Sequence, residues 1–130
     1  LIDEFVSNHK QRSISFTSLG HLNYLSSVQF VDGVVGNSSS GLMEVPTFKI
    51  GTINIGDRQK GRLKADSIID CNPNKASISE AIGKLYSKDF QTGLQRVQNP
   101  YGDGSATDRI IEIIRSKKLP SEIKKKFNDI

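Results

Sequence analysis

The feature that most constrains the fold is an apolar segment, residues 30–35, that stops abruptly at Gly36-Asn37. Three consecutive serines follow, and a short apolar segment holding Glu44 leads into a β-branched run at 51–55. Three adjacent hydroxyls between glycines are poor core material. They suit a turn from a strand into a helix, where hydroxyls and backbone N–H groups can face an anion. The pattern predicts a strand, a turn, a short helix around 42–45 that ends near Pro46, and a second strand.

Strand-like and helix-like segments alternate along the rest of the chain, which indicates an α/β domain with a mostly parallel sheet. We expect a helix from Ser77, because Glu80 three residues later completes a capping-box pattern. Ser105 is expected to cap another helix, which Pro120 ends. The segments together predict a Rossmann-like, three-layer α/β fold. The expected strands are 13–16, 30–35, 51–55 and 67–69, and the earlier helices are 1–10 and 22–28.

The composition narrows the function classes. Among 130 residues, 18 Lys and Arg against 14 Asp and Glu give a net charge of +4. Much of the excess lies near the C-terminus, where five lysines cluster at 117–118 and, within the tail at 119–130, at 124–126. The chain has no Trp and no basic stretch interleaved with aromatics, so we do not expect nucleic-acid binding. No apolar stretch approaches the roughly 20 residues needed to cross a bilayer, so we expect no membrane span.

The single cysteine and the two histidines bear on compartment and metal binding. Cys71 alone cannot form an internal disulfide, and a lone thiol fits a reducing, cytoplasmic compartment. His9 and His21 lie far apart in the sequence, so no metal-ligand spacing exists, and we expect neither a metal nor another cofactor. The chain starts at Leu1 without an initiator Met. We therefore expect it to belong to a longer polypeptide.

Two loops are candidates for a ligand site. In open α/β sheets, ligands bind beyond the carboxyl ends of the strands, and the serine turn and the loop 56–62 follow consecutive predicted strands. We therefore expect these loops side by side at one edge of the sheet. Glu44 can accept hydrogen bonds from two vicinal ribose hydroxyls, and Arg58 offers a planar fork for phosphate. Ser38, Ser39 and Ser40 can donate to phosphate oxygens, and Gly41 allows a close approach of the backbone.

Each of these features also has a simpler interpretation. The serine cluster can be a helix cap with solvated neighbours, and a glutamate in a short helix can face solvent. Arg58 and Arg62, four residues apart, can both be solvated side chains. The shared position of these residues at one predicted edge favours a ligand site, because all three simpler interpretations would have to hold together.

Several segments, taken in order, resemble one enzyme family. They are similar to the hydrolysing UDP-N-acetylglucosamine 2-epimerases of sialic or legionaminic acid biosynthesis and to their relatives acting on UDP-N,N′-diacetylbacillosamine. The resemblance covers nearly the whole chain. The matching segments are Gly-Asn-Ser-Ser-Ser-Gly at 36–41, Glu-Val-Pro at 44–46, Asn-Ile-Gly-Asp-Arg-Gln-Lys-Gly-Arg at 54–62, Asn-Pro-Tyr-Gly-Asp-Gly at 99–104 and the ending Lys-Lys-Phe-Asn-Asp-Ile at 125–130.

The resemblance implies a GT-B architecture, in which two Rossmann-like domains face each other across a cleft, and this chain is similar to the C-terminal domain. Because the chain opens in a predicted helix, we expect the first strand of that domain to be missing. The implied nucleotide contacts are Ser38 and Ser39 to the diphosphate of UDP, Glu44 to the ribose hydroxyls, Arg58 beside the nucleotide, and the turn at Ser18-Leu19 to uracil through backbone groups. Weaker candidates are Ser40, Gly41, Gln59 and Arg62.

The reaction that the resemblance implies converts UDP-N-acetylglucosamine and water into N-acetylmannosamine and UDP, by elimination of UDP followed by hydration. The family carries its acidic residues and catalytic histidine upstream of this segment. We therefore expect no catalytic residue here, and neither His9 nor His21 is assigned that role. This chain alone is expected to bind UDP weakly and to be inactive. The implied partners are UDP, the UDP-N-acetylhexosamine, the N-terminal domain of the same polypeptide, and a second copy in a homodimer.

Three alternatives stay open. The substrate can be UDP-N,N′-diacetylbacillosamine instead, since the two sugars differ on the ring, which the other domain is expected to contact. A GT-B glycosyltransferase C-terminal domain also binds UDP through an acid that follows a strand, a turn and a helix. A non-catalytic nucleotide-binding module is the alternative from a different class of protein.

Overall fold

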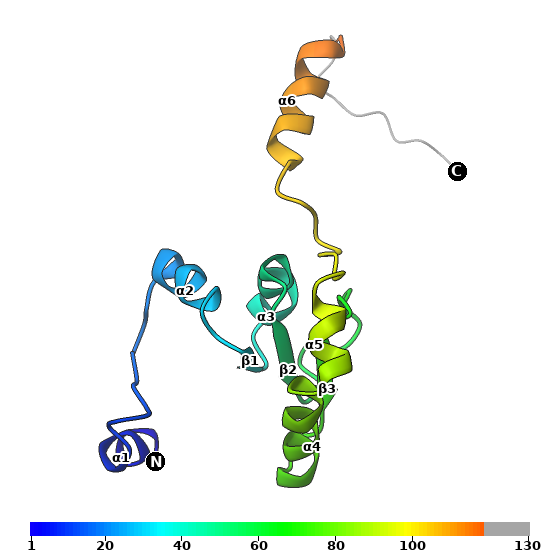
Figure 1. The fold of residues 1–130 in the computed structure, drawn as a ribbon. Helices are drawn as coiled ribbons and strands as arrows, with labels where there is room; N and C mark the ends of the chain where they lie inside the picture. The colour runs from blue at the N-terminus through cyan, green and yellow to red at the C-terminus, as the bar shows by residue number, and fades with distance from the viewer. Residues whose placement is uncertain (119–130) are drawn as a thin grey trace.

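The computed structural model describes residues 1–118 (Figure 1). Strands and helices alternate through its central part, as the sequence predicts. The elements are α1 (Ile2–Asn8), α2 (His21–Val28), β1 (Gly33–Gly36), α3 (Ser40–Met43), the 3₁₀ helix η1 (Val45–Phe48), β2 (Gly51–Ile55), β3 (Ile68–Cys71), α4 (Lys75–Leu85), α5 (Lys88–Leu94) and α6 (Ala106–Ser116).

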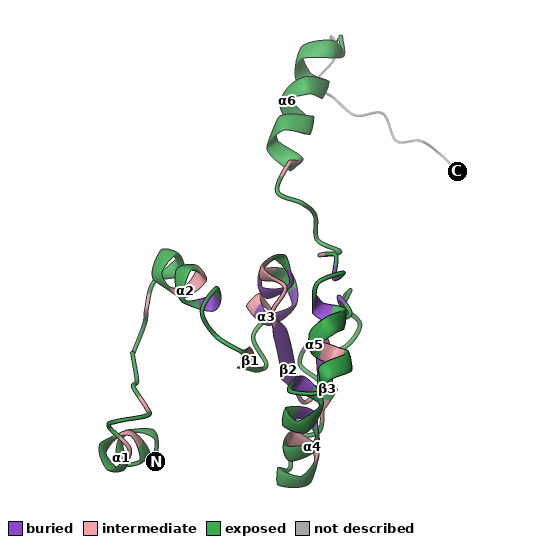
Figure 2. Cartoon of the chain, viewed as in Figure 1, coloured by how far each residue is buried: buried purple, intermediate pink, exposed green. Residues whose placement is uncertain are grey.

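The three strands form one parallel sheet in the order β1-β2-β3. In the register, Gly33 lies opposite Gly51, and Thr52 lies opposite Ile68. The central strand β2 is buried at its first four positions, and Figure 2 shows this buried segment at the centre of the domain. Because all strands run in one direction, their carboxyl ends meet at a single edge, where ligands bind in such sheets.

Helices cover both faces of the sheet, so the domain has three layers. Successive side chains of a strand point to opposite faces. Ile53 packs with Ile69 against Ala81 and Leu85 of α4 on one face. Thr52 points to the other face, where its hydroxyl donates to the backbone carbonyl of Gly41 in α3 at 3.0 Å. The predicted Rossmann-like, three-layer α/β fold is confirmed.

Two facing glycines let α4 approach the sheet closely. A Cβ atom added at Gly33 would lie 2.6 Å from a methyl carbon of Leu85, and one added at Gly51 would lie 2.4 Å from the other methyl carbon. Such distances are far inside van der Waals contact, so a side chain at either position would push α4 outward. Leu85 is 3% exposed and fills the space that these glycines leave.

Three strand predictions differ from the structure, and the smallest difference is at 67–69, where β3 spans Ile68–Cys71. The strand expected at 13–16 is wrong, because this segment runs between α1 and α2 away from the sheet, where no strand is available to pair with it (Figure 1). The strand expected at 30–35 starts only at Gly33. The N–H groups of Phe30 and Val31 instead bond back to carbonyls at the end of α2, so these residues extend the helix as a turn.

The helix caps also differ from the predictions. α4 is capped by Asn74, whose Oδ1 accepts the Ser77 N–H at 2.9 Å, so the capping box at Ser77 is wrong and Ser77 lies in the first turn. Ser105 precedes α6 as expected, but its hydroxyl donates to Asp103 and makes no capping bond. α6 ends at Ser116. Pro120, the expected end of that helix, and the tail 119–130 lie outside the described residues.

α6 extends away from the sheet beyond the turn at 99–104 (Figure 1). Its four isoleucines are between 40% and 56% exposed, although its apolar and polar residues alternate at helical spacing. Within residues 1–118, no helix is long and apolar enough to cross a membrane.

Candidate functional site

The serine turn and the loop 56–62 lie side by side at the carboxyl edge of the sheet, as predicted. The turn follows β1, and the loop follows β2, which is hydrogen-bonded to β1. Gln59 joins the two directly, since its side-chain nitrogen donates to the backbone carbonyl of Asn37 at 2.7 Å. Gln59 is 2% exposed. Its amide therefore holds the two loops together from inside the fold, a role that the sequence does not indicate.

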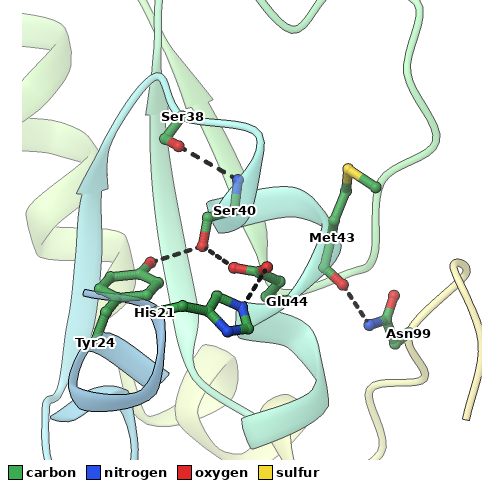
Figure 3. Close-up of polar contacts among 7 residues, drawn as sticks. All are labelled: His21, Tyr24, Ser38, Ser40, Met43, Glu44 and Asn99. Carbon is green, nitrogen blue, oxygen red and sulfur yellow. Dashed lines mark hydrogen bonds and ion pairs between the residues drawn. The ribbon is translucent and has the colours of Figure 1, made fainter. Parts of the chain in front are cut away.

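Glu44 is held by residues from two helices (Figure 3). The Ser40 hydroxyl lies 2.5 Å from Glu44 Oε2, and His21 Nε2 lies 3.4 Å from Glu44 Oε1. Tyr24 Oη lies 2.9 Å from the Ser40 hydroxyl. The Glu44 side chain keeps 37% of its surface exposed, so it stays open to a ligand while these neighbours restrain it.

The Ser40 hydroxyl is already used within the protein. A hydroxyl has one proton to donate and two lone pairs to accept with. An ionised Glu44 can only accept, so the Ser40 proton goes to Glu44 Oε2, and the Tyr24 hydroxyl donates to a Ser40 lone pair. This arrangement leaves Ser40 with no proton for a phosphate oxygen unless the bond to Glu44 breaks.

Ser38 and Ser39 remain the candidate phosphate donors. The Ser38 side chain is exposed, and its oxygen accepts the Ser40 N–H at 3.4 Å, which leaves its own proton free to point outward. Ser39 occupies the N-cap position of α3 without a side-chain capping bond. α3 has only four residues and continues into η1, whose first turn holds Pro46. An anion here would be held by hydroxyl and N–H groups of the turn more than by a helix dipole.

Gly41 is a packing position. It is buried, and a Cβ atom placed on it would lie 2.7 Å from the Cγ2 methyl of Thr52. The sequence predicts that glycine allows close approach of the backbone here, and the structure shows that the approaching group is β2 of the same chain.

The two arginines of the second loop are exposed. Arg62 Nη1 lies 3.9 Å from the sulfur of Met43, which places Arg62 against the end of α3. Arg58 lies one residue before Gln59, whose side chain reaches the serine turn, so the backbone at Arg58 is held close to that turn. The backbone at Arg58 and the guanidinium of Arg62 therefore both lie near α3, the helix that the serine turn begins.

The turn at Ser18-Leu19 also reaches the site. Ser18 Oγ accepts the backbone N–H of Gly20 at 3.2 Å, and Gly20, with φ of +70°, leads directly into α2. His21, the first residue of α2, contacts Glu44. The segment expected to read uracil and the carboxylate expected to hold the ribose are thus neighbours in the structure.

The turn at 99–104 packs beside the site and is hydrogen-bonded to the segments around α3 and after the loop 56–62. The Asn99 amide donates to the Met43 carbonyl at 2.7 Å and to the Thr47 hydroxyl at 2.8 Å, and Figure 3 shows its reach to α3. Tyr101 donates its hydroxyl proton to the carbonyl of Leu63 at 3.0 Å. This turn therefore fixes the C-terminal end of α3, and Glu44 is the next residue after that helix.

A hollow of about 450 Å³ opens where β2 and β3 end and is lined in part by Asp57, Asp70 and Cys71. Burial raises the pKa of Asp70, but hydrogen bonds from Lys64 and Asn54 outweigh it and leave the pKa below its ordinary value. Burial and the Asp70 charge raise the pKa of the Cys71 thiol. Across residues 1–118, no group of three or more His, Cys, Asp or Glu side chains is placed to hold a metal ion.

Sequence reasoning missed the side chains that support Glu44 and the serine turn. Tyr24 lies in the predicted helix 22–28, and His21 comes just before it. Because α2 in fact starts at His21, the two side chains, three residues apart, lie on one helix face. The sequence could not show that this face of α2 lies against Ser40 and Glu44, because that depends on how α2 packs in the fold. The tie made by Gln59 carries no spacing signal at all, because it spans 22 residues between two loops.

A parallel sheet covered by helices on both faces, with polar loops at its carboxyl edge, defines an α/β domain of the Rossmann-like class. The family model described as UDP-N-acetylglucosamine 2-epimerase matches residues 1–115 of this chain. The chain therefore belongs to the UDP-N-acetylglucosamine 2-epimerase family, and the resemblance identified from the sequence is confirmed.

Three relatives illustrate the range. The chain is 42% identical to polysialic acid biosynthesis protein P7 of Escherichia coli over 72% of its length, which is 24% of that protein. It is 39% identical to the hydrolysing GDP/UDP-N,N′-diacetylbacillosamine 2-epimerase of Campylobacter jejuni. That alignment covers the full length of this chain and 35% of the relative. It is 26% identical to the UDP-N-acetylglucosamine 2-epimerase of Neisseria meningitidis over 89% of its length and 30% of that protein. The chain thus spans a quarter to a third of the relatives it matches.

Proposed function

We propose that this chain is the UDP-binding part of a hydrolysing UDP-sugar 2-epimerase. The observation that carries the proposal is the placement of Glu44, the serine turn and the loop 56–62 at one edge of a parallel sheet, in a chain of this family. In this proposal Ser38 and Ser39 bind the diphosphate, Glu44 accepts the ribose hydroxyls, and Arg58 lies beside the nucleotide. Uracil lies against the backbone at Ser18-Leu19.

The proposed reaction needs two kinds of help, and this chain supplies one. A base removes the proton at C2 of the sugar, and the C1–O bond breaks so that UDP leaves with both bonding electrons. Water then adds across the double bond and gives the free C2 epimer. Hydrogen-bond donors and cations around the departing diphosphate stabilise its charge, which is the role of the serine turn and Arg58. The base belongs to a part of the polypeptide outside this chain.

The exposed face of α6 supports a second domain in the same polypeptide. Isoleucines at four positions of one helix stay 40–56% exposed in the described residues. A soluble helix normally buries its apolar stripe. We propose that the remaining part of the polypeptide covers this stripe and completes a GT-B arrangement. A homodimer and a cytoplasmic location stay predictions.

Calorimetry with UDP tests the nucleotide role. We expect measurable binding by the 130-residue chain. Ser38→Ala or Arg58→Ala should weaken it about tenfold or more, since each removes a hydrogen-bond donor or a positive charge that contacts the diphosphate. Ser79→Ala and Arg115→Ala are matched controls, because both residues are exposed and lie on α4 and α6, far from the serine turn and the loop 56–62 in the sequence. Unchanged binding in Ser38→Ala and Arg58→Ala together would refute the assignment.

An activity assay on the whole enzyme tests the reaction and the substrate. Incubation with a UDP-sugar and water alone should release UDP and a free sugar, whereas a glycosyltransferase requires an acceptor. The 130-residue chain by itself should release none. UDP-N,N′-diacetylbacillosamine is the second candidate substrate, because the Campylobacter jejuni relative that aligns with the full chain is named for that sugar. UDP bound without turnover of either sugar by the whole protein would favour a non-catalytic module.

A further inference from the structure

We propose that Ser40 and Tyr24 are positioning residues for Glu44, and that they link recognition of the ribose to the helix that follows the uracil turn. This inference rests on the proposed function, in which Glu44 holds the ribose hydroxyls. It also removes Ser40 from the set of phosphate ligands, which sequence reasoning had included.

The geometry of the carboxylate supports this role. Ser40 donates to Oε2 of Glu44 at 2.5 Å and His21 contacts Oε1, so both oxygens, and with them the plane of the carboxylate, are restrained. A carboxylate has about four acceptor positions on its two oxygens. One bond from Ser40 and one contact from His21 at 3.4 Å leave positions open for the two vicinal hydroxyls of a ribose.

The Tyr24 hydroxyl supports the hydrogen bond from Ser40 to Glu44. The Tyr24 side chain is half-buried and lies on α2, one helical turn after His21. Because its hydroxyl donates to Ser40, the Ser40 lone pair is occupied and the Ser40 proton is directed at Glu44 (Figure 3). Donation in such a chain strengthens the following bond, because each hydroxyl polarises the next.

The chain of hydrogen bonds connects two parts of the nucleotide site. α2 starts immediately after the turn at Ser18-Leu19, and α3 starts immediately after the serine turn. A ligand that shifts the turn at Ser18-Leu19 also shifts Tyr24 on α2. Through the hydrogen bond from Tyr24 to Ser40, it changes the orientation of the Glu44 carboxylate. Recognition of the base and of the ribose are therefore mechanically coupled in this fold.

Comparing UDP with 2′-deoxy-UDP isolates the contribution of Glu44. The deoxy analogue has the same base and diphosphate but one hydroxyl fewer for the carboxylate. We expect the wild-type chain to bind UDP roughly tenfold more tightly than the analogue, as one lost charge-assisted hydrogen bond predicts. Ser40→Ala and Tyr24→Phe should reduce this preference several-fold, mainly by weakening UDP, and leave affinity for the analogue nearly unchanged.

Two variants separate positioning from a general structural effect. Ser40→Thr keeps the hydroxyl and should restore most of the preference that Ser40→Ala loses. Tyr86→Phe is the matched control for Tyr24→Phe, because Tyr86 is an exposed tyrosine at the end of α4, and it should leave the preference unchanged. Tyr24→Phe keeps the aromatic ring, so it tests the hydroxyl even if Ser40→Ala proved unstable.

Three results would overturn the inference. Equal weakening of UDP and the analogue by Ser40→Ala would make Ser40 a phosphate ligand. An unchanged preference in both Ser40→Ala and Tyr24→Phe, with a normal wild-type preference, would show that Glu44 needs no positioning and would leave the proposed function intact. A wild-type chain that binds both nucleotides equally, or neither, would overturn the role of Glu44 itself and the inference with it.

Discussion

Substitution of Gly41 by alanine gives the sharpest test of how the site is supported. Gly41 is buried in α3, between the serine turn and Glu44. Its new methyl group would lie 2.7 Å from the Cγ2 methyl of Thr52, on a strand that is itself buried. Either α3 moves off the sheet or Thr52 rotates and loses its 3.0 Å hydrogen bond to the Gly41 carbonyl.

The expected loss of stability follows from three opposing effects. Overpacking a core position costs about 1–3 kcal/mol, and a weakened buried hydrogen bond costs about 1 kcal/mol more. The better helix propensity of alanine returns about 0.5–1 kcal/mol. We therefore expect Gly41→Ala to lower the free energy of unfolding by about 1–3 kcal/mol. Affinity for UDP should fall too, because α3 carries Ser40 and ends at Glu44.

Urea unfolding followed by circular dichroism measures this change, and two further variants locate its cause. Gly83→Ala is the matched control: Gly83 lies inside α4 with open space around it, so alanine should stabilise the chain by about 0.4–1 kcal/mol. Adding Thr52→Ser to Gly41→Ala deletes the clashing methyl group and keeps the hydroxyl. The double variant should therefore lose less stability than the sum of the losses in the two single variants. A Gly41→Ala chain as stable as the wild type, or strictly additive losses, would refute the packing argument.

Three other predictions concern the core and the hollow beside β3. Leu85→Ala should destabilise the chain by about 2–5 kcal/mol in urea unfolding, because Leu85 fills the space above two glycines, and a loss below about 1 kcal/mol would contradict that packing. The pKa of the Asp70 carboxyl lies below its ordinary value of 3.8; its contribution to stability is therefore complete above that value and is lost as the pH falls through the lowered pKa. Asp70→Asn should remove this part of the acid-induced loss of stability, as unfolding titrations between pH 5 and 2 would show, and an unchanged profile would contradict it. Because burial and the Asp70 charge raise the pKa of Cys71, its thiol should react with iodoacetamide at pH 7 more slowly than a free cysteine, and Asp70→Asn should speed the reaction; equal rates would count against this.

The alternation of short apolar runs with turn residues was enough to predict the central fold. Residues 51–55 were placed without error because the segment is rich in β-branched residues, Thr52, Ile53 and Ile55, and a glycine stands at each end, Gly51 and Gly56. The strand at 13–16 was wrong because an alternating pattern shows that a segment can pair, and only the sheet decides whether a partner is within reach. Asn74 was overlooked as the cap of α4 because Ser77 and Glu80 form the same pattern three residues later.

The sequence by itself determined the class of fold, the meeting of the serine turn and the loop 56–62 at one edge of the sheet, and the family, because these depend on local patterns and on several motifs in a fixed order. The tertiary structure decided the division of work among the polar residues. Whether Ser40 faces a phosphate or Glu44, and whether Gln59 faces a ligand or the Asn37 carbonyl, depends on polar groups 16 and 22 residues away in the chain. Hydrogen-bond partners that far apart are chosen by packing of helices on the sheet, and no local pattern in the sequence encodes them.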